Sequence, residues 1–183
     1  MTDQPRIRPI ASRDDVAPEH RVIADRVSAF FGQIRGPFGM LLHSPELANQ
    51  ILDVVEDIRE KTIVDHQSRV LAILATVRER DAPYVWAAQV GYARRVGLRE
   101  EAIDVIRTRG DTSVLTQEER EIVDYSRELA RTDKVSQERF DALLRRHGER
   151  WLVELTASAQ FYNCLCGVVG AFQVPVPEGG DRV

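Results

Sequence analysis

The side chains of this sequence that could do chemistry begin with its two cysteines. Cys164 and Cys166 are separated by a single residue. On a helix, side chains two positions apart do not face each other, so their geometry disfavours a disulfide. A redox pair would favour the C-x-x-C spacing, which places both sulfurs at the start of one helix. Because free cysteine is often buried, two buried thiols in a helix are the interpretation that the sequence favours over a redox pair.

A second group of side chains could line a small-molecule site. Gln89 can donate and accept hydrogen bonds, so it could orient a carbonyl or a carboxylate, or it could be an amide satisfied elsewhere. Trp86 could line a ligand pocket, although a large aromatic residue at helical spacing also suits a core or an interface. Tyr162 could point its hydroxyl into a cavity, or bond to the backbone. His66 is a candidate for proton transfer, and a capping or surface histidine is the alternative.

The other histidines suggest no catalytic site. His20 is expected to be exposed, and His43 to lie in a turn before a helix. His147 follows two arginines at a helix end, where cations suit the helix dipole. The sequence contains no phosphate loop, nucleotide fingerprint or cluster of metal ligands, so we expect no cofactor and no metal.

Composition places these residues in an ordinary globular protein. The 183 residues are 43% hydrophobic and 30% charged, which suits one domain with a real core. The net charge of -4 implies no strong attraction to nucleic acid or to an anionic membrane. No uninterrupted apolar run reaches the roughly 20 residues needed to span a bilayer. The first residues lack the apolar core of a secretory signal, so we expect a cytoplasmic protein.

The elements that must position the candidate residues are two helices between Asp65 and Gly97. In the first helix, apolar residues return at steps of three and four and share one broad face. Pro83 cannot continue that helix but suits the first turn of the next one. The second helix carries Trp86 and Gln89, and Gly97 can take the left-handed conformation that ends a helix.

The rest of the chain predicts more helices and no strand. Proline, glycine and capping signals mark helices that begin near Pro18, Ser44, Arg99, Thr116, Ser136 and Arg150. We therefore expect an all-α multi-helix bundle over residues 18–177, preceded by an irregular N-terminal arm over 1–17 and followed by a flexible tail over 178–183. The last long helix is apolar on more than one side. Its extra face is expected in the bundle centre or in a subunit interface.

Several short stretches carry a resemblance to a known family. They are Gly36-Pro37-Phe38, Leu42 to Ala48, Tyr84-Val85-Trp86 and Ala93 to Leu98. In their order and spacing, the chain resembles the carboxymuconolactone decarboxylase and alkylhydroperoxidase-D-like superfamily from about Gly32 to Pro177. The resemblance implies an all-helical fold, a homo-oligomer such as a trimer or hexamer, and an active site around the two central helices.

The resemblance fails at the residues that do the family's chemistry. The two cysteine positions hold Ala82 and Val85, the histidine position holds Gln89, and the usual glutamate position holds Val70. In members without cysteines a glutamate often precedes the tryptophan, but here Val85 precedes Trp86. Alanine and valine cannot become thiolates, and glutamine does not titrate. The thiol-dependent hydroperoxide reductase activity of the family is therefore disfavoured.

Two functional hypotheses from different classes remain. In the first, the protein has a small-molecule pocket for a small cyclic or carboxylated organic compound. Phe38, Trp86, Gln89 and Tyr162 would shape it, and His66, four residues and one helical turn before Val70, would be the candidate catalytic base. In the second, the protein is a catalytically inactive binding or assembly subunit. Both predict a homo-oligomer, and neither predicts nucleic acid or membrane as a partner.

Overall fold

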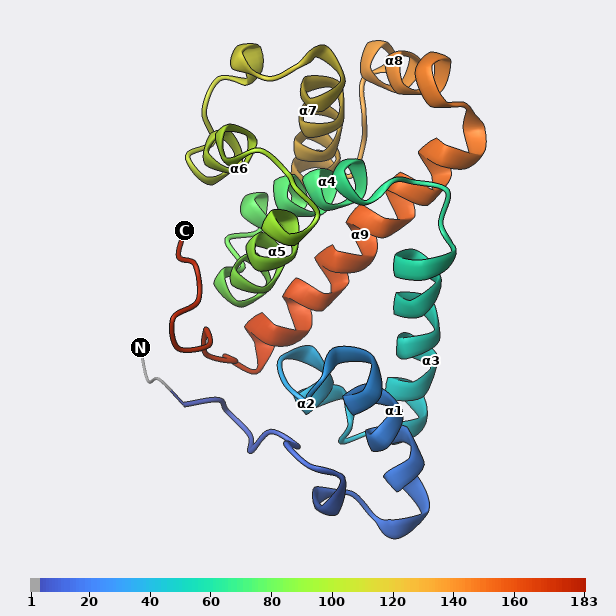
Figure 1. Ribbon diagram of the computed structural model, residues 1–183, viewed down its shortest axis with the longest axis vertical. Coiled ribbons are helices and arrows are strands. Elements are labelled where there is room, and N and C mark those ends of the chain that lie inside the picture. The colour runs from blue at the N-terminus through green and yellow to red at the C-terminus, as the bar shows by residue number, and fades with distance from the viewer. Residues whose placement is uncertain (1–3) are drawn as a thin grey trace. The chain divides into compact units, whose positions relative to one another are not determined.

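The computed structural model describes residues 4–183 and is built from helices, with no strand among those residues (Figure 1). The prediction of an all-α fold is confirmed. The α-helices are α1 (Arg21–Phe31), α2 (Pro37–Leu41), α3 (Pro45–Glu56), α4 (His66–Glu79), α5 (Pro83–Arg95), α6 (Glu100–Arg107), α7 (Gln117–Thr132), α8 (Gln137–His147) and α9 (Glu149–Ala171). Short 3-10 turns are η1 (Arg13–Asp15), η2 (Pro18–His20) and η4 (Thr112–Val114), and a π-helical turn, η3 (Asp57–Lys61), follows α3.

The chain forms two compact units, and α9 contributes to both. The first unit contains the chain up to Lys61 and Gly167–Pro175, and the second contains Thr62–Cys166 and Val176–Val183. The single domain predicted over residues 18–177 stays a prediction. The sequence marks no boundary at Lys61, because no proline- or glycine-rich linker follows it.

In the first unit, α1 packs on α3, and the N-terminal segment is pinned by backbone bonds. Ile10 donates its N–H to the carbonyl of Gly39 (2.8 Å), and a Cβ on Gly39 would lie 3.1 Å from the Ile10 oxygen. This close approach explains a glycine at that position. The segment that begins at Pro37 is the short helix α2, because proline suits a first helical turn.

Val22 is an apolar residue of α1 that does not face the core of the first unit. Its side chain is 70% exposed. Its neighbours on the inward face, Ala24 and Val27, are fully buried. Because an α-helix has 3.6 residues per turn, Val22 lies on a different side of α1 from Ala24 and Val27 and cannot face the same core.

In the second unit, α4 is the central helix. Every residue from Ser68 to Val77 is buried, and α4 packs on α5, α6 and α7. Asp65 caps α4 by accepting a hydrogen bond from the Ser68 N–H (2.9 Å). The predicted break and helix stop are confirmed, since α5 begins at Pro83 and Gly97 has a φ of +77°.

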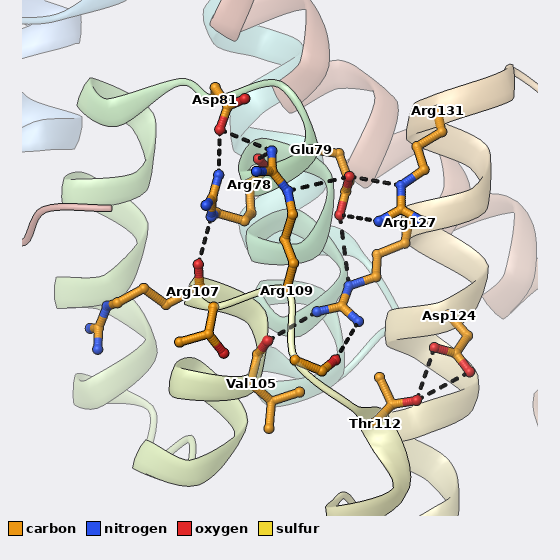
Figure 2. A network of polar contacts seen from close by, with 12 residues as sticks. Arg78, Glu79, Asp81, Val105, Arg107, Arg109, Thr112, Asp124, Arg127 and Arg131 are labelled. Atoms are coloured by element: carbon orange, nitrogen blue, oxygen red, sulfur yellow. Dashed lines mark hydrogen bonds and ion pairs between the residues drawn. The ribbon is translucent and has the colours of Figure 1, made fainter.

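An arginine-rich network joins α4, α6 and α7 on one side of this unit (Figure 2). The carboxylate of Glu79, whose side chain is 6% exposed, lies 2.8 Å from Arg131, 3.6 Å from Arg109 and 3.8 Å from Arg127. A buried carboxylate is stable only when it is paired, and here three guanidiniums surround it.

Arginines of this network also donate hydrogen bonds to backbone carbonyls at and after the end of α6. Arg127 donates to the carbonyls of Val105 (3.0 Å) and Gly110 (3.2 Å), and Arg78 donates to the carbonyl of Arg107 (2.7 Å). The last carbonyls of a helix have no partner within the helix, and cations suit its C-terminal end. Burial lowers the pKa of Arg127, and the charge of Glu79 opposes that shift. These contacts join α4, α6 and α7, so the network stabilises the packing of the three helices.

α9 matches its predicted range closely, Glu149–Ala171 against Arg150 to Phe172. It is also the one helix among the described residues whose length and composition would allow it to cross a membrane, a test that core helices of other proteins also pass. Part of its surface is apolar and uncovered: Val153 is 66% exposed.

Candidate functional site

Three polar side chains meet where α4 begins and α5 ends. His66 and Arg69 lie one turn apart on α4, and Tyr92 comes from the last two turns of α5. Arg69 Nη2 lies 2.9 Å from His66 Nδ1 and 3.0 Å from Tyr92 Oη, and the Tyr92 oxygen lies 3.1 Å from His66 Nδ1. We call this the His66–Arg69–Tyr92 cluster. Of the sequence-predicted residues, it contains His66.

The charged member of the cluster is the most deeply buried. Arg69 is 1% exposed, and its second terminal nitrogen, Nη1, has no hydrogen-bond partner among the described residues. A guanidinium is costly to bury, and buried polar groups without partners are rare. The position is therefore one where an incoming hydrogen-bond acceptor, above all an anion, would gain a strong interaction.

Arg69 also sets the tautomer of His66. A guanidinium can only donate hydrogen bonds, so the imidazole nitrogen that it approaches must accept. The proton of the neutral ring then sits on Nε2. His66 is exposed, so this N–H is available to a bound molecule.

Neighbouring contacts hold the cluster in place. Gln67 donates to the carbonyls of Val96 (3.0 Å) and Gly97 (3.3 Å), which ties the start of α4 to the end of α5. The Arg95 guanidinium lies 5.6 Å from the Tyr92 ring centre, a cation–π distance. The side chains that would have to act together are thus fixed from both helices.

The other predicted site residues are buried. In the second unit, Trp86 is fully buried, and Gln89 and Tyr162 are each 4% exposed. Gln89 lies three residues before Tyr92 and so on the same face of α5. Phe38 belongs to the first unit, where its ring centre lies 5.0 Å from that of Phe31. The predicted grouping of Phe38 with the other three stays a prediction.

Trp86 has a polar partner that the sequence analysis missed. Its indole N–H donates to Asp181 in the C-terminal tail (3.2 Å), and the Arg107 guanidinium lies 5.9 Å from its ring centre. Asp181 also pairs with Arg107 (3.0 Å) and Arg94 (3.1 Å). Burial raises the pKa of Asp181, but the bond from Trp86 and the two guanidiniums outweigh it, so the pKa lies below its usual value.

Comparison with known proteins identifies the fold of this chain. No protein-family model and no curated protein sequence matches the chain. A solved structure does: an alkylhydroperoxidase AhpD core, described as an uncharacterized peroxidase-related protein from Ralstonia eutropha JMP134, superposes with a TM-score of 0.78 at 15% identity, over 96% of this chain and 93% of that one. The chain has the alkylhydroperoxidase-D-like fold.

Two further structures agree with this fold. The debrominase Bmp8, solved as a cysteine-to-alanine variant in complex with 2,3,4-tribromopyrrole, has a TM-score of 0.75 at 16% identity, over 93% of this chain and 91% of that one. A peroxidase-related protein from Silicibacter sp. TM1040 has a TM-score of 0.74 at 15% identity, over 94% and 93%. Likeness at this identity establishes the fold and leaves the activity to the residues themselves.

The two residues at the positions where the sequence resemblance places the family's cysteines are apolar and buried. Ala82 is 7% exposed and Val85 is 4% exposed. On α9, burial raises the pKa of the Cys166 thiol to about 12, far above the range in which a thiolate forms. Cys164 is exposed, so the sequence expectation of two buried thiols is wrong for Cys164, which lies on the outer face of α9.

The remaining histidines lie outside the cluster. The His43 ring bonds to the carbonyl of Arg8 (2.9 Å), and His20 lies 3.4 Å from Glu46. His147 ends α8, as predicted, and its ring stacks on Trp151 at 3.7 Å. Among residues 4–183, no group of three or more His, Cys, Asp or Glu side chains is arranged to hold a metal ion.

Proposed function

We propose that this protein binds a small cyclic or carboxylated organic compound and transforms it by proton transfer, without thiol chemistry. The His66–Arg69–Tyr92 cluster carries the proposal, because it combines a titratable ring, a hydroxyl and a fixed positive charge within 3.1 Å of one another. It lies between the two helices that hold the active site in the family this chain resembles. We expect the protein to work in the cytoplasm as a homo-oligomer, a trimer or hexamer.

The cluster can deliver one proton to the compound, with Tyr92 replacing the proton that His66 gives up. His66 Nε2–H donates its proton to an oxygen or carbon of the bound compound, and Nδ1 takes the hydroxyl proton of Tyr92. The imidazole stays neutral, and the phenolate that forms lies beside Arg69, whose positive charge stabilises it. The reverse sequence removes a proton from the compound and restores the hydroxyl.

Binding would use the positive charge of Arg69 and the side chains of Gln89, Trp86 and Tyr162. The unpartnered Nη1 of Arg69 favours a carboxylate or enolate oxygen, and Gln89 would orient a carbonyl with its amide. Bmp8, which shares the fold, was solved with a small brominated pyrrole, which supports a small cyclic ligand here as well. Trp86 and Tyr162 supply aromatic surface of the kind that lines such sites.

Deuterium exchange tests the proposal across a range of candidate substrates. The protein is incubated in D2O with a panel of small lactones and cyclic carboxylic acids, and proton NMR follows deuterium incorporation or product. The wild type is expected to act on at least one compound. Tyr92→Phe and His66→Asn are each expected to lower the rate by about 100-fold or more, the usual weight of general acid–base groups.

The controls make the result specific. His43→Asn changes a histidine of the other unit and should leave the rate unchanged, and Arg69→Lys keeps a positive charge but loses the two-pronged donor. If no compound in the panel exchanges or reacts, or if Tyr92→Phe and His66→Asn react as fast as the wild type, the proposal is wrong.

A binding or assembly subunit is the second candidate, and one observation favours it. Val153 is 66% exposed on α9, and the sequence from Thr156 to Ala171 contains no charged residue. An uncharged helix surface of this length is typical of an interface. Under this hypothesis, no compound reacts, and removal of the α9 contacts is the change that disturbs the protein.

A further inference from the structure

The C-terminal tail carries a carboxylate that is bound like a ligand. Both oxygens of Asp181 accept two donors each. Trp86 Nε1 (3.2 Å) and Arg107 Nη2 (3.0 Å) donate to Oδ1, while Arg107 Nη2 (3.2 Å) and Arg94 Nη1 (3.1 Å) contact Oδ2. Two guanidiniums and an indole N–H around one carboxylate are the donors that recognise carboxylate ligands in general.

A tight turn in the tail holds the segment that carries Asp181 close to α5. Gly180 donates its N–H to the carbonyl of Pro177 (2.9 Å), and Gly179 between them has a φ of +72°, which closes a tight turn. A Cβ on Gly180 would lie 2.9 Å from the Pro177 oxygen and 3.2 Å from the Ala87 side chain of α5. The backbone therefore approaches α5 closely there, and glycine is the residue that fits.

The receiving side exists independently of the tail. Arg94 lies on α5 and is also bound by Glu100 (2.7 Å), while Arg107 lies at the end of α6 and is also bound by Asp104. Trp86 is fully buried in α5. Without Asp181, Arg94 Nη1 and Arg107 Nη2 would lose this acceptor, and the indole N–H of the buried Trp86 would lack a partner. Leaving such a donor unpaired is costly, so an incoming monoanion restores what the tail supplied.

We propose that Trp86, Arg94 and Arg107 form a binding site for a small monocarboxylate, which the chain's own Asp181 occupies and closes. A free carboxylate and the tail then compete for the same donors. A ligand held on a short flexible segment has an effective concentration on the order of millimolar, so free carboxylates bind weakly while the tail is in place. Displacement of the tail opens the site. The proposal uses no residue of the His66–Arg69–Tyr92 cluster and shares only Trp86 with the proposed function, so the loss of proton transfer in Tyr92→Phe and His66→Asn does not bear on it.

The two tryptophans give a direct readout. The chain contains Trp86 and Trp151, so a nitrogen–proton NMR spectrum shows two indole signals, and Trp86→Phe identifies the one from Trp86. The probe is benzoate, with benzamide as its uncharged counterpart. Asp181→Ala removes the internal carboxylate and leaves its donors available to the probe. Gly180→Ala keeps Asp181 but pushes the tail away from α5.

Both variants are expected to move the Trp86 signal and to bind benzoate at least tenfold more tightly than the wild type. Glu178→Ala, which removes an exposed carboxylate from the same tail, and Gly167→Ala, where an added Cβ meets no atom within 4 Å, should bind as the wild type does. Benzamide should not bind. Adding Arg107→Gln to Asp181→Ala should abolish benzoate binding, with thermal melts showing that each variant is folded.

Three results would overturn the proposal. Asp181→Ala binding benzoate no better than the wild type would show that Asp181 does not occupy a ligand site. Equal binding of benzamide and benzoate, or unchanged binding after Arg107→Gln, would show that the arginines recognise no carboxylate. A Trp86 signal unchanged in both tail variants would show that the tail does not close the site.

Discussion

At the scale of single residues, the two cysteines differ in burial, and we expect them to differ in reactivity for that reason. Cys164 is exposed, whereas burial raises the pKa of Cys166 to about 12. Iodoacetamide at pH 8 is expected to alkylate Cys164 first and Cys166 only after unfolding, because the thiolate is the form that reacts. Mass spectrometry of the digested protein checks the order. Faster modification of Cys166 would contradict the assigned burial.

The same chemistry predicts no thiol-dependent peroxide reduction. Ala82 and Val85 occupy the positions where the sequence resemblance places the cysteines of the peroxidase members, and neither can form a sulfenic acid. A peroxide assay with a dithiol donor should show turnover no higher than the buffer alone. Turnover that disappears in Cys164→Ser would show instead that the exposed cysteine does the chemistry.

The sequence identified part of the candidate site at this scale. His66 was a candidate because histidine titrates near neutral pH, and Arg69 lies one turn away on the same predicted helix. Tyr92 comes from the next helix, and its approach to His66 depends on how α4 and α5 pack, which helical periodicity alone does not define. Asp181 was missed because a short polar tail with two glycines predicts disorder until its turn and its partners are seen.

At the scale of elements, Glu154 on α9 holds the segment that leads into α4. It accepts hydrogen bonds from the Thr62 hydroxyl (2.7 Å) and the Ile63 N–H (2.7 Å), and it pairs with Arg150 (2.8 Å). The Thr62 bond, Arg150 and the Ile63 N–H together lower its pKa to about 2. This carboxylate therefore favours the folded state while it is charged.

The sign of its pH dependence follows from that shift. An unfolded glutamate has a pKa near 4.5, so the stabilisation by Glu154 is complete above that pH and is lost as the pH falls toward 2. Glu154→Gln should remove this part of the pH dependence, so wild type and variant should differ in stability at pH 7 and converge near pH 2. Urea unfolding at several pH values measures it, with Glu178→Gln as the control. A difference that stays constant with pH would contradict the assignment.

The arginine network predicts unequal costs for its members. Glu79 is the buried carboxylate between three guanidiniums, so Glu79→Gln is expected to cost roughly 3 kcal/mol, as when one partner of a buried ion pair is removed. Arg131, whose side chain is 53% exposed, is paired with the same carboxylate, and Arg131→Gln should cost less than about 1 kcal/mol. Urea unfolding compares the two. Equal costs would show that burial does not set the energetics of the network.

Element types were easier to predict than element surfaces. Capping at Thr116, the break at Pro83 and the stop at Gly97 are local signals, and the structure confirms each. The Val22 side chain is exposed although it is apolar, because the face that a helix buries depends on which neighbours it meets. Local sequence carries little of that information.

At the scale of the whole molecule, the chain returns to its first unit within α9, near the C-terminal end of that helix. Gly167–Pro175 belongs to the first unit, while the preceding part of α9 belongs to the second. Neither a linker nor a change in composition marks that passage, so the sequence predicted one domain. The alkylhydroperoxidase-D-like fold was predicted from scattered short motifs, and the structural comparisons support it over more than nine-tenths of the chain.

Homo-oligomer formation is the prediction that belongs to this scale, and two exposed valines test it. Val153 on α9 and Val22 on α1 are 66% and 70% exposed. Both valines have charged residues close by in sequence, but only Val153 is followed by a long uncharged stretch of helix, Thr156 to Ala171. If that stretch forms the apolar interface, a charge at Val153 is buried beside it and is costly, whereas a charge at Val22 stays in solvent. Val153→Glu should therefore dissociate the assembly, and Val22→Glu should not. Light scattering at micromolar concentration measures both, and a wild-type mass of 20.8 kDa, that of one chain, would remove the oligomer and every role of α9 in it.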